Sequence, residues 1–85
     1  MANLIKADGG ISKIEHIQTM GLDDFQKLVG GYIEPIYGVD YVAIVNEEGL
    51  LKRLPLNMRA SNMMKAPLVG DVIIMSWKEW KNRNQ

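Results

Sequence analysis

The stretch between residues 50 and 75 constrains the fold of this chain more than any other part of it. Its apolar residues are interrupted by two prolines, after which a glycine leads into a final apolar run. Because proline lacks an amide hydrogen and does not continue a helix or a strand, the prolines delimit a short helix at 58–64 that begins after Asn57. We expect a buried strand to follow at 69–75.

Most of the remaining chain has the signals of short strands separated by turns. Asp8-Gly9-Gly10 is typical of a tight turn, because glycine adopts positive φ readily, and it predicts a first hairpin. Apolar residues at i, i+3, i+6 and i+7 predict an amphipathic helix at 22–29, which Gly30-Gly31 should end with a left-handed cap. We expect strands at 4–5, 11–17, 32–37, 41–45 and 50–54.

The expected strands differ in their places in the sheet. Residues 41–45 are the most continuous β-prone run, and the turn after them should return the chain as 50–54, which makes this pair the central hairpin. Pro35 cannot donate to a ladder, so its strand is expected on an edge or at a bulge. The order ββαββ(α)β predicts an α+β fold: a small, mostly antiparallel sheet packed with one or two short helices and a C-terminal helical turn.

The C-terminal tail carries a capping-box pattern, because Ser76 and Glu79 can each satisfy the backbone amide of the other. This pattern predicts a helical turn or two, with a frayed end at 82–85. Trp77 and Trp80 lie three residues apart and share a face of that helix. They either pack across the core or form a pair of anchors for a partner protein.

The chain has 85 residues, enough for a single domain over residues 1–85. It has no cysteine, which excludes a disulfide framework, a thiolate metal site and a catalytic thiol. No run is long and apolar enough for a signal peptide or a membrane span. We therefore expect a cytoplasmic protein without a membrane partner.

Residue types that carry chemistry are present, but without the spacing that catalysis needs. His16 has no second histidine with which to share a metal ion, and we expect it on the surface. Asp23-Asp24 and Glu47-Glu48 are adjacent pairs whose side chains point apart, unlike the facing acids of a hydrolase. No phosphate-binding glycine loop occurs. An enzyme is the least supported class, and we expect neither a metal nor a cofactor.

The formal net charge is zero, but the charges are divided unevenly along the chain. Residues 1–51 carry three basic and eight acidic side chains, and residues 52–85 carry seven basic and two acidic ones, so the halves have charges of −5 and +5. Either the halves neutralise each other across one small domain, or the second provides a basic face for phosphate or an acidic partner. Nucleic acid is disfavoured, because the whole chain is neutral and lacks a basic recognition helix.

The segment 52–65 is the strongest candidate for a site, because it contains four cations, several methionines and no acid. Arg53 and Arg59 can each bind an anion through two parallel hydrogen bonds, with Asn57 and Ser61 as further donors. Methionines also suit adaptable partner surfaces. The alternative is that the methionines only cover the sheet while the cations stay solvated.

Four segments resemble a known family in their letters, order and spacing: 28–34 (Leu-Val-Gly-Gly-Tyr-Ile-Glu), 43–49 (Ala-Ile-Val-Asn-Glu-Glu-Gly), 54–57 (Leu-Pro-Leu-Asn) and 69–74 (Val-Gly-Asp-Val-Ile-Ile). Over roughly residues 3–75, the chain resembles domain of unknown function 3846, small proteins from bacteriophage, plasmid and bacterial genomes. Met58, placed before Arg59, and the tail at 76–85 depart from the family's pattern. The resemblance implies a cytoplasmic accessory protein of a mobile element, and it implies no chemistry.

Two functions from different classes remain as hypotheses. The first is a protein-interaction module, such as an inhibitor of a host or defence protein, that binds through an exposed sheet edge or through Trp77 and Trp80. The second is a binder of a nucleotide or another phosphorylated metabolite at Arg53 and Arg59, in a pocket between subunits because so small a monomer has little interior. A homodimer can form where an unprotected sheet edge pairs across a two-fold axis.

Overall fold

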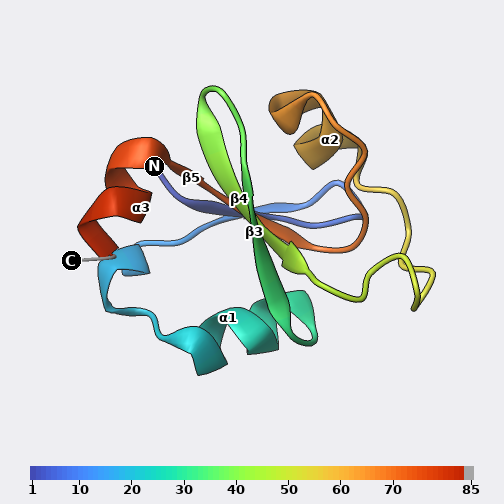
Figure 1. Ribbon diagram of the computed structural model, residues 1–85, viewed down its shortest axis with the longest axis horizontal. Coiled ribbons are helices and arrows are strands. Elements are labelled where there is room, and N and C mark those ends of the chain that lie inside the picture. Colours follow the sequence, from blue (N-terminus) through green and yellow to red (C-terminus); the bar gives the residue numbers. More distant parts are fainter. Residues whose placement is uncertain (84–85) are drawn as a thin grey trace.

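The structure, a computed structural model, describes residues 1–83, and within them a five-stranded antiparallel sheet carries the fold in the spatial order β2-β1-β5-β4-β3 (Figure 1). The α+β class predicted from the sequence is confirmed. The strands are β1 (Asn3–Ile5), β2 (Ile11–Lys13), β3 (Ile33–Tyr37), β4 (Tyr41–Asn46) and β5 (Val72–Ser76). The helices are α1 (Leu22–Val29), α2 (Met58–Met64) and α3 (Trp77–Arg83), with a short 3₁₀ helix, η1 (Ile17–Thr19).

The sheet is covered on both faces, so its central strands are buried from both sides. Successive residues of β4 alternate between the faces: Val42 and Ile44 join the cluster that contains residues of α1 and η1, and Ala43 and Val45 join the cluster that contains residues of α2. Figure 1 shows α1 and α2 on opposite sides of the strands. This double burial explains why β4 and β5 are continuous apolar runs instead of alternating ones.

The two edges of the sheet end differently. In and beside β3, the backbone N–H and C=O groups of the even-numbered residues point toward β4. This follows from the hydrogen bonds from Glu47 N to Tyr32 O (2.8 Å) and from Gly38 N to Tyr41 O (2.9 Å). The backbone of Pro35 therefore faces outward, where its missing amide hydrogen interrupts the free edge. The prediction that this strand lies on an edge is confirmed. The opposite edge is β2, which has only three residues.

The predicted central hairpin between 41–45 and 50–54 is wrong. Both sides of β4 are occupied, by β3 and by β5, so no position remains beside it for a further strand. Residues 50–54 form turns instead, including a hydrogen bond of 3.0 Å from Leu54 N to Gly49 O. β5, which is distant in the sequence, pairs with the side of β4 that residues 50–54 were expected to occupy.

The first hairpin forms as predicted, but its second strand is shorter than expected. Gly9 turns the chain with a φ of +101°. The strand predicted at 11–17 ends at Lys13, and Ile17 is instead buried in η1. His16 precedes η1 and is exposed, as expected, although it does not lie on a strand.

The C-terminal helix is longer and better anchored than the predicted frayed end. Arg83 belongs to α3, and its guanidinium donates hydrogen bonds to the carbonyls of Ile17 (2.6 Å) and Met20. The same guanidinium lies 4.4 Å from the centre of the Phe25 ring. These contacts join α3 to η1 and α1. The remainder of the predicted frayed end, 84–85, lies outside the described residues.

Asn57 connects three parts of the fold through a side chain that is fully buried. Its amide nitrogen donates to the carbonyls of Ile5 and Gly70, both at 2.8 Å. Its oxygen accepts a hydrogen bond of 3.0 Å from the backbone of Ala60, which confirms its predicted role as the N-cap of α2. One side chain thus holds β1, the approach to β5 and the start of α2.

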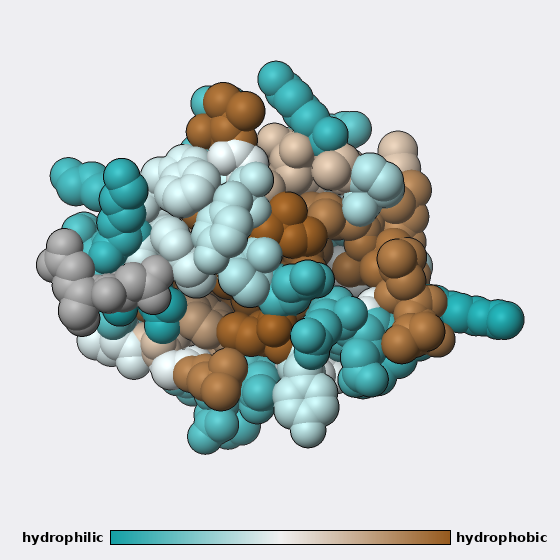
Figure 2. Space-filling model, in the orientation of Figure 1, coloured by the Kyte–Doolittle hydropathy of each residue, from teal (hydrophilic) through white to brown (hydrophobic). Residues whose placement is uncertain are grey.

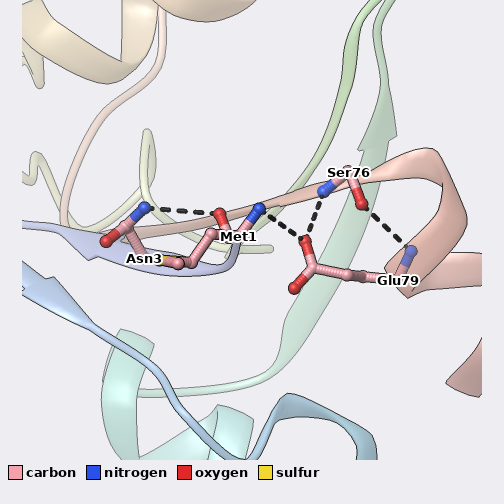
Figure 3. A network of polar contacts seen from close by, with 4 residues as sticks. All are labelled: Met1, Asn3, Ser76 and Glu79. Carbon is pink, nitrogen blue, oxygen red and sulfur yellow. Dashed lines mark hydrogen bonds and ion pairs between the residues drawn. The ribbon is translucent and has the colours of Figure 1, made fainter.

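Glu79 and Ser76 form the predicted capping box at the start of α3 (Figure 3). Glu79 N donates to Ser76 Oγ at 3.1 Å, and Ser76 N donates to Glu79 Oε1 at 2.9 Å. The same carboxylate oxygen lies 3.3 Å from the terminal amine of Met1. Burial raises the pKa of Glu79, but the hydrogen bonds from Ser76 and the charge of the amine outweigh it and hold this pKa below its ordinary value of 4.5.

We predict that Asn57→Ala lowers the free energy of unfolding by about 3 kcal/mol or more, because it leaves two carbonyls and one amide unpaired in the core. Urea denaturation measures this loss. Asn62→Ala, on an exposed position of the same helix, is the matched control and should change the free energy by less than about 0.5 kcal/mol. Equal losses in the two variants would contradict the structural role of Asn57.

The Glu79 carboxylate should also make stability depend on pH. Since its pKa is lower in the folded than in the unfolded chain, its contribution is fully present above the unfolded value near 4.5 and is lost as the pH falls through the folded value. Glu79→Gln should therefore flatten the decline of the urea midpoint below pH 4.5. Glu47→Gln, at an exposed position, is the control that should keep the wild-type profile. A wild-type profile for Glu79→Gln would refute this assignment.

Candidate functional site

Four large apolar side chains are exposed within nine residues of the chain, on the loop 47–57 and at the start of α2. We call them the aliphatic surface, and their exposed fractions are 82% for Leu50, 84% for Leu51, 48% for Leu56 and 61% for Met58. Figure 2 shows hydrophobic side chains gathered at the end of the molecule where Figure 1 places this loop. Contiguous apolar exposure of this kind marks interaction sites in small proteins.

The loop is bounded by two buried asparagines, Asn46 and Asn57. The Asn46 side chain donates to the carbonyl of Val29 at 3.2 Å and accepts from Glu48 N at 2.8 Å, which ties the start of the loop to α1. At the other end, the backbone N–H of Asn57 donates to Leu68 O at 2.8 Å. The loop is therefore fixed at both ends.

Close packing fixes the middle of the loop as well. A side chain at Gly49 would lie 2.8 Å from a methyl carbon of Val69, and one at Gly70 would lie 2.8 Å from Leu54. Gly70 also has a φ of +75° and donates its amide to Pro55 O at 2.7 Å. Because the loop packs inward through these positions, the aliphatic surface is held outward by the fold.

A small cavity lies beneath one side of the aliphatic surface. Its volume is about 120 Å³, and Leu50 lines it together with Ile36, Val45 and Leu68 from the sheet and the loop before β5. Its lining also includes the carboxylate-bearing Glu34 and Glu47. The volume suits one aliphatic side chain and is well below the ~300 Å³ that small-molecule sites usually reach.

All four cations of the segment 52–65 are exposed. Lys52 lies 3.8 Å from Glu48. Within residues 1–83, Arg53, Arg59 and Lys65 form no ion pair. Arg53 and Lys65 have φ values of +54° and +57°, a conformation that costs a residue other than glycine about 1 kcal/mol or more.

The predicted site residues do not converge on one point. Arg53 and Arg59 are exposed and free to bind an anion. Asn57, in contrast, has already donated both amide hydrogens inside the core. Ser61 Oγ is paired with the backbone of Leu68, to which it donates at 3.2 Å and from which it accepts at 2.8 Å. Asn57 and Ser61 therefore serve the fold, and the cations of the segment face solvent.

Trp77 and Trp80 are half-buried and pack against the core cluster on the α1 face. The Trp77 indole stacks on Tyr37 with ring centres 5.6 Å apart, and Trp80 meets the same tyrosine edge-on at 5.8 Å. Trp77 Nε1 donates to the carbonyl of Gly38 at 3.0 Å. These contacts join α3 to the β3–β4 hairpin. The proposed role of the tryptophans as partner anchors stays a prediction.

The described residues offer non-covalent chemistry at this surface, namely burial of aliphatic side chains and pairing of cations. Among residues 1–83, histidine and carboxylate side chains nowhere gather in a group of three that could hold a metal ion. None of the helices in the described part of the chain has the length and apolar character of a membrane span.

Sequence analysis missed the exposure of Leu50 and Leu51, which it assigned to the central hairpin. A signal was present in the run Leu50-Leu51-Lys52-Arg53, because two apolar residues followed by two cations do not alternate as the two faces of a strand do. The exposure of both leucines follows from the loss of that hairpin.

Comparison with known proteins gives a family but no described relative. No curated protein matches the chain, and no solved structure matches it. A family model described as Domain of unknown function (DUF3846) matches residues 2–83. The match includes α3 and its tryptophans, so the resemblance extends beyond the predicted 3–75. Because this model covers nearly the whole chain, the protein belongs to the DUF3846 family.

Proposed function

We propose that this protein is a non-enzymatic interaction module that binds a partner protein through the aliphatic surface. The observation that carries the proposal is the exposure of Leu50 and Leu51, at 82% and 84%, on a loop whose ends are fixed by hydrogen bonds of the buried Asn46 and Asn57. A fold that places two adjacent leucines in solvent without using them for packing has left them available for another molecule.

Burial of these two leucines alone does not offset the free energy that association costs. Complete burial of one leucine contributes about 1.5–3 kcal/mol, so the two contribute about 3–6 kcal/mol. Association costs about 4–15 kcal/mol in lost translational and rotational freedom. Leu56 and Met58 must therefore be covered too, and the fixed ends of the loop help because little backbone entropy is lost on binding.

The proposal keeps the wider expectation drawn from the sequence. It describes a cytoplasmic accessory protein of a phage or another mobile element that binds a host or element-encoded protein. An inhibitor of a host or defence protein is one form that such a module takes.

We predict that the double variant Leu50→Ser, Leu51→Ser loses its partner while keeping its fold, because both side chains are exposed. The measurement is site-specific photo-cross-linking in the cells that carry the protein, with a photoreactive phenylalanine in place of Leu51. A defined cross-linked protein should form there, and it should be absent when the same probe replaces Leu22, an α1 residue that is 57% exposed.

Purified proteins provide the matched control for this prediction. Val39→Ser removes a side chain that is 89% exposed on the turn between β3 and β4, and it should bind the cross-linked partner as the wild type does. Urea midpoints should agree among the variants. The proposal fails if position 51 gives no specific cross-link, or if the double variant binds the partner with wild-type affinity.

A further inference from the structure

We propose that the occupant of the aliphatic surface is an acidic, amphipathic segment of the partner protein, whose carboxylates pair with Arg53 and Arg59. This inference rests on the proposed function and adds the chemistry of the partner to it. The inference requires that the cations are not already paired with acidic residues of the chain. It also requires that their positions are not explained by the stability of the fold, and that the surface favours a protein over other anionic partners.

The cations beside the aliphatic surface are available. Arg53 and Arg59 are exposed, and neither forms an ion pair with any residue of the described part of the chain. Arg59 directly follows Met58 of the aliphatic surface, and Arg53 lies two residues after Leu51. No acidic residue occurs between positions 49 and 70. Apolar contact and positive charge are thus offered together.

The backbone gives an independent indication that the Arg53 side chain is used. Arg53 has a φ of +54°, a conformation that glycine would adopt without steric cost. It does not cap a helix, and within residues 1–83 it forms no ion pair that would stabilise the fold. A strained cation at this position therefore fits a binding role.

Charge on the opposite side of the surface favours a protein over an anionic lipid layer. Glu34 and Glu47 line the cavity under Leu50, so this edge of the surface is acidic while the edge with Arg53 and Arg59 is basic. A lipid layer presents one sign of charge everywhere and would be repelled at the acidic edge. A protein segment can place its carboxylates on the basic edge alone and insert an aliphatic side chain beside Leu50.

The test uses fluorescence anisotropy with two labelled helical peptides. Both carry leucines at i, i+3, i+4 and i+7; one has glutamate and the other lysine at the remaining exposed positions. The acidic peptide should bind the intact protein more tightly, and high salt should weaken it. Arg53→Gly should weaken it roughly two- to fivefold, while its urea midpoint equals or exceeds that of the wild type. The control is Lys78→Gln, Lys81→Gln, two exposed cations of α3, which should bind as the wild type.

Each other outcome overturns the inference. Equal binding of the two peptides would show that charge does not select the partner, and wild-type affinity in Arg53→Gly would remove the assigned cation. Preferential binding to vesicles of phosphatidylglycerol and phosphatidylcholine would make lipid the occupant. The proposed function fails separately: if Leu50→Ser, Leu51→Ser leaves the acidic peptide bound while Arg53→Gly releases it, the aliphatic surface is not the docking site.

Discussion

The fold depends on two buried asparagines, Asn46 and Asn57, the buried polar residues of the described chain. Each carboxamide connects segments that are far apart in sequence: Asn46 reaches the carbonyl at the end of α1, and Asn57 reaches those of Ile5 and Gly70. Leaving a buried amide unpaired costs more free energy than one hydrogen bond contributes, so each asparagine requires its partner carbonyls in one arrangement. The two asparagines therefore fix the ends of the loop that lies between them.

This constraint explains why the aliphatic surface exists. β4 ends at Asn46 with both of its neighbours already in place, so the chain that leaves it finds no free sheet edge. Eleven residues later, Asn57 must start α2 against the opposite face of the sheet from α1. The intervening residues pack inward through Gly49 and Leu54, which leaves Leu50 and Leu51 in solvent.

Local signals predicted much of the fold, and long-range pairing decided the rest. The turn at Gly9, the cap at Gly30, the helix after Asn57 and the capping box of α3 each depend on a few adjacent residues, and all were predicted. The hairpin at 50–54 failed because the competitor for β4 was a strand some thirty residues away. The same limit applies to Arg83, whose partners in η1 lie more than sixty residues earlier.

The candidate site was predictable in composition but not in geometry. The charges of −5 and +5 left open whether the two halves neutralise each other, and the described residues show one side-chain ion pair between them, Lys52 with Glu48. The acids of residues 1–51 are distributed over α1, β3 and the turns and loops between the elements, whereas the cations at 52–65 follow one continuous loop and helix. Since Asn57 and Ser61 are paired inside the fold while Arg53, Leu56, Met58 and Arg59 are exposed, unbalanced positive charge lies next to apolar side chains. An unpaired cation in water contributes little to the stability of the fold. A cation beside exposed leucines contributes to binding, because a second molecule that covers the leucines also excludes water from around the charge.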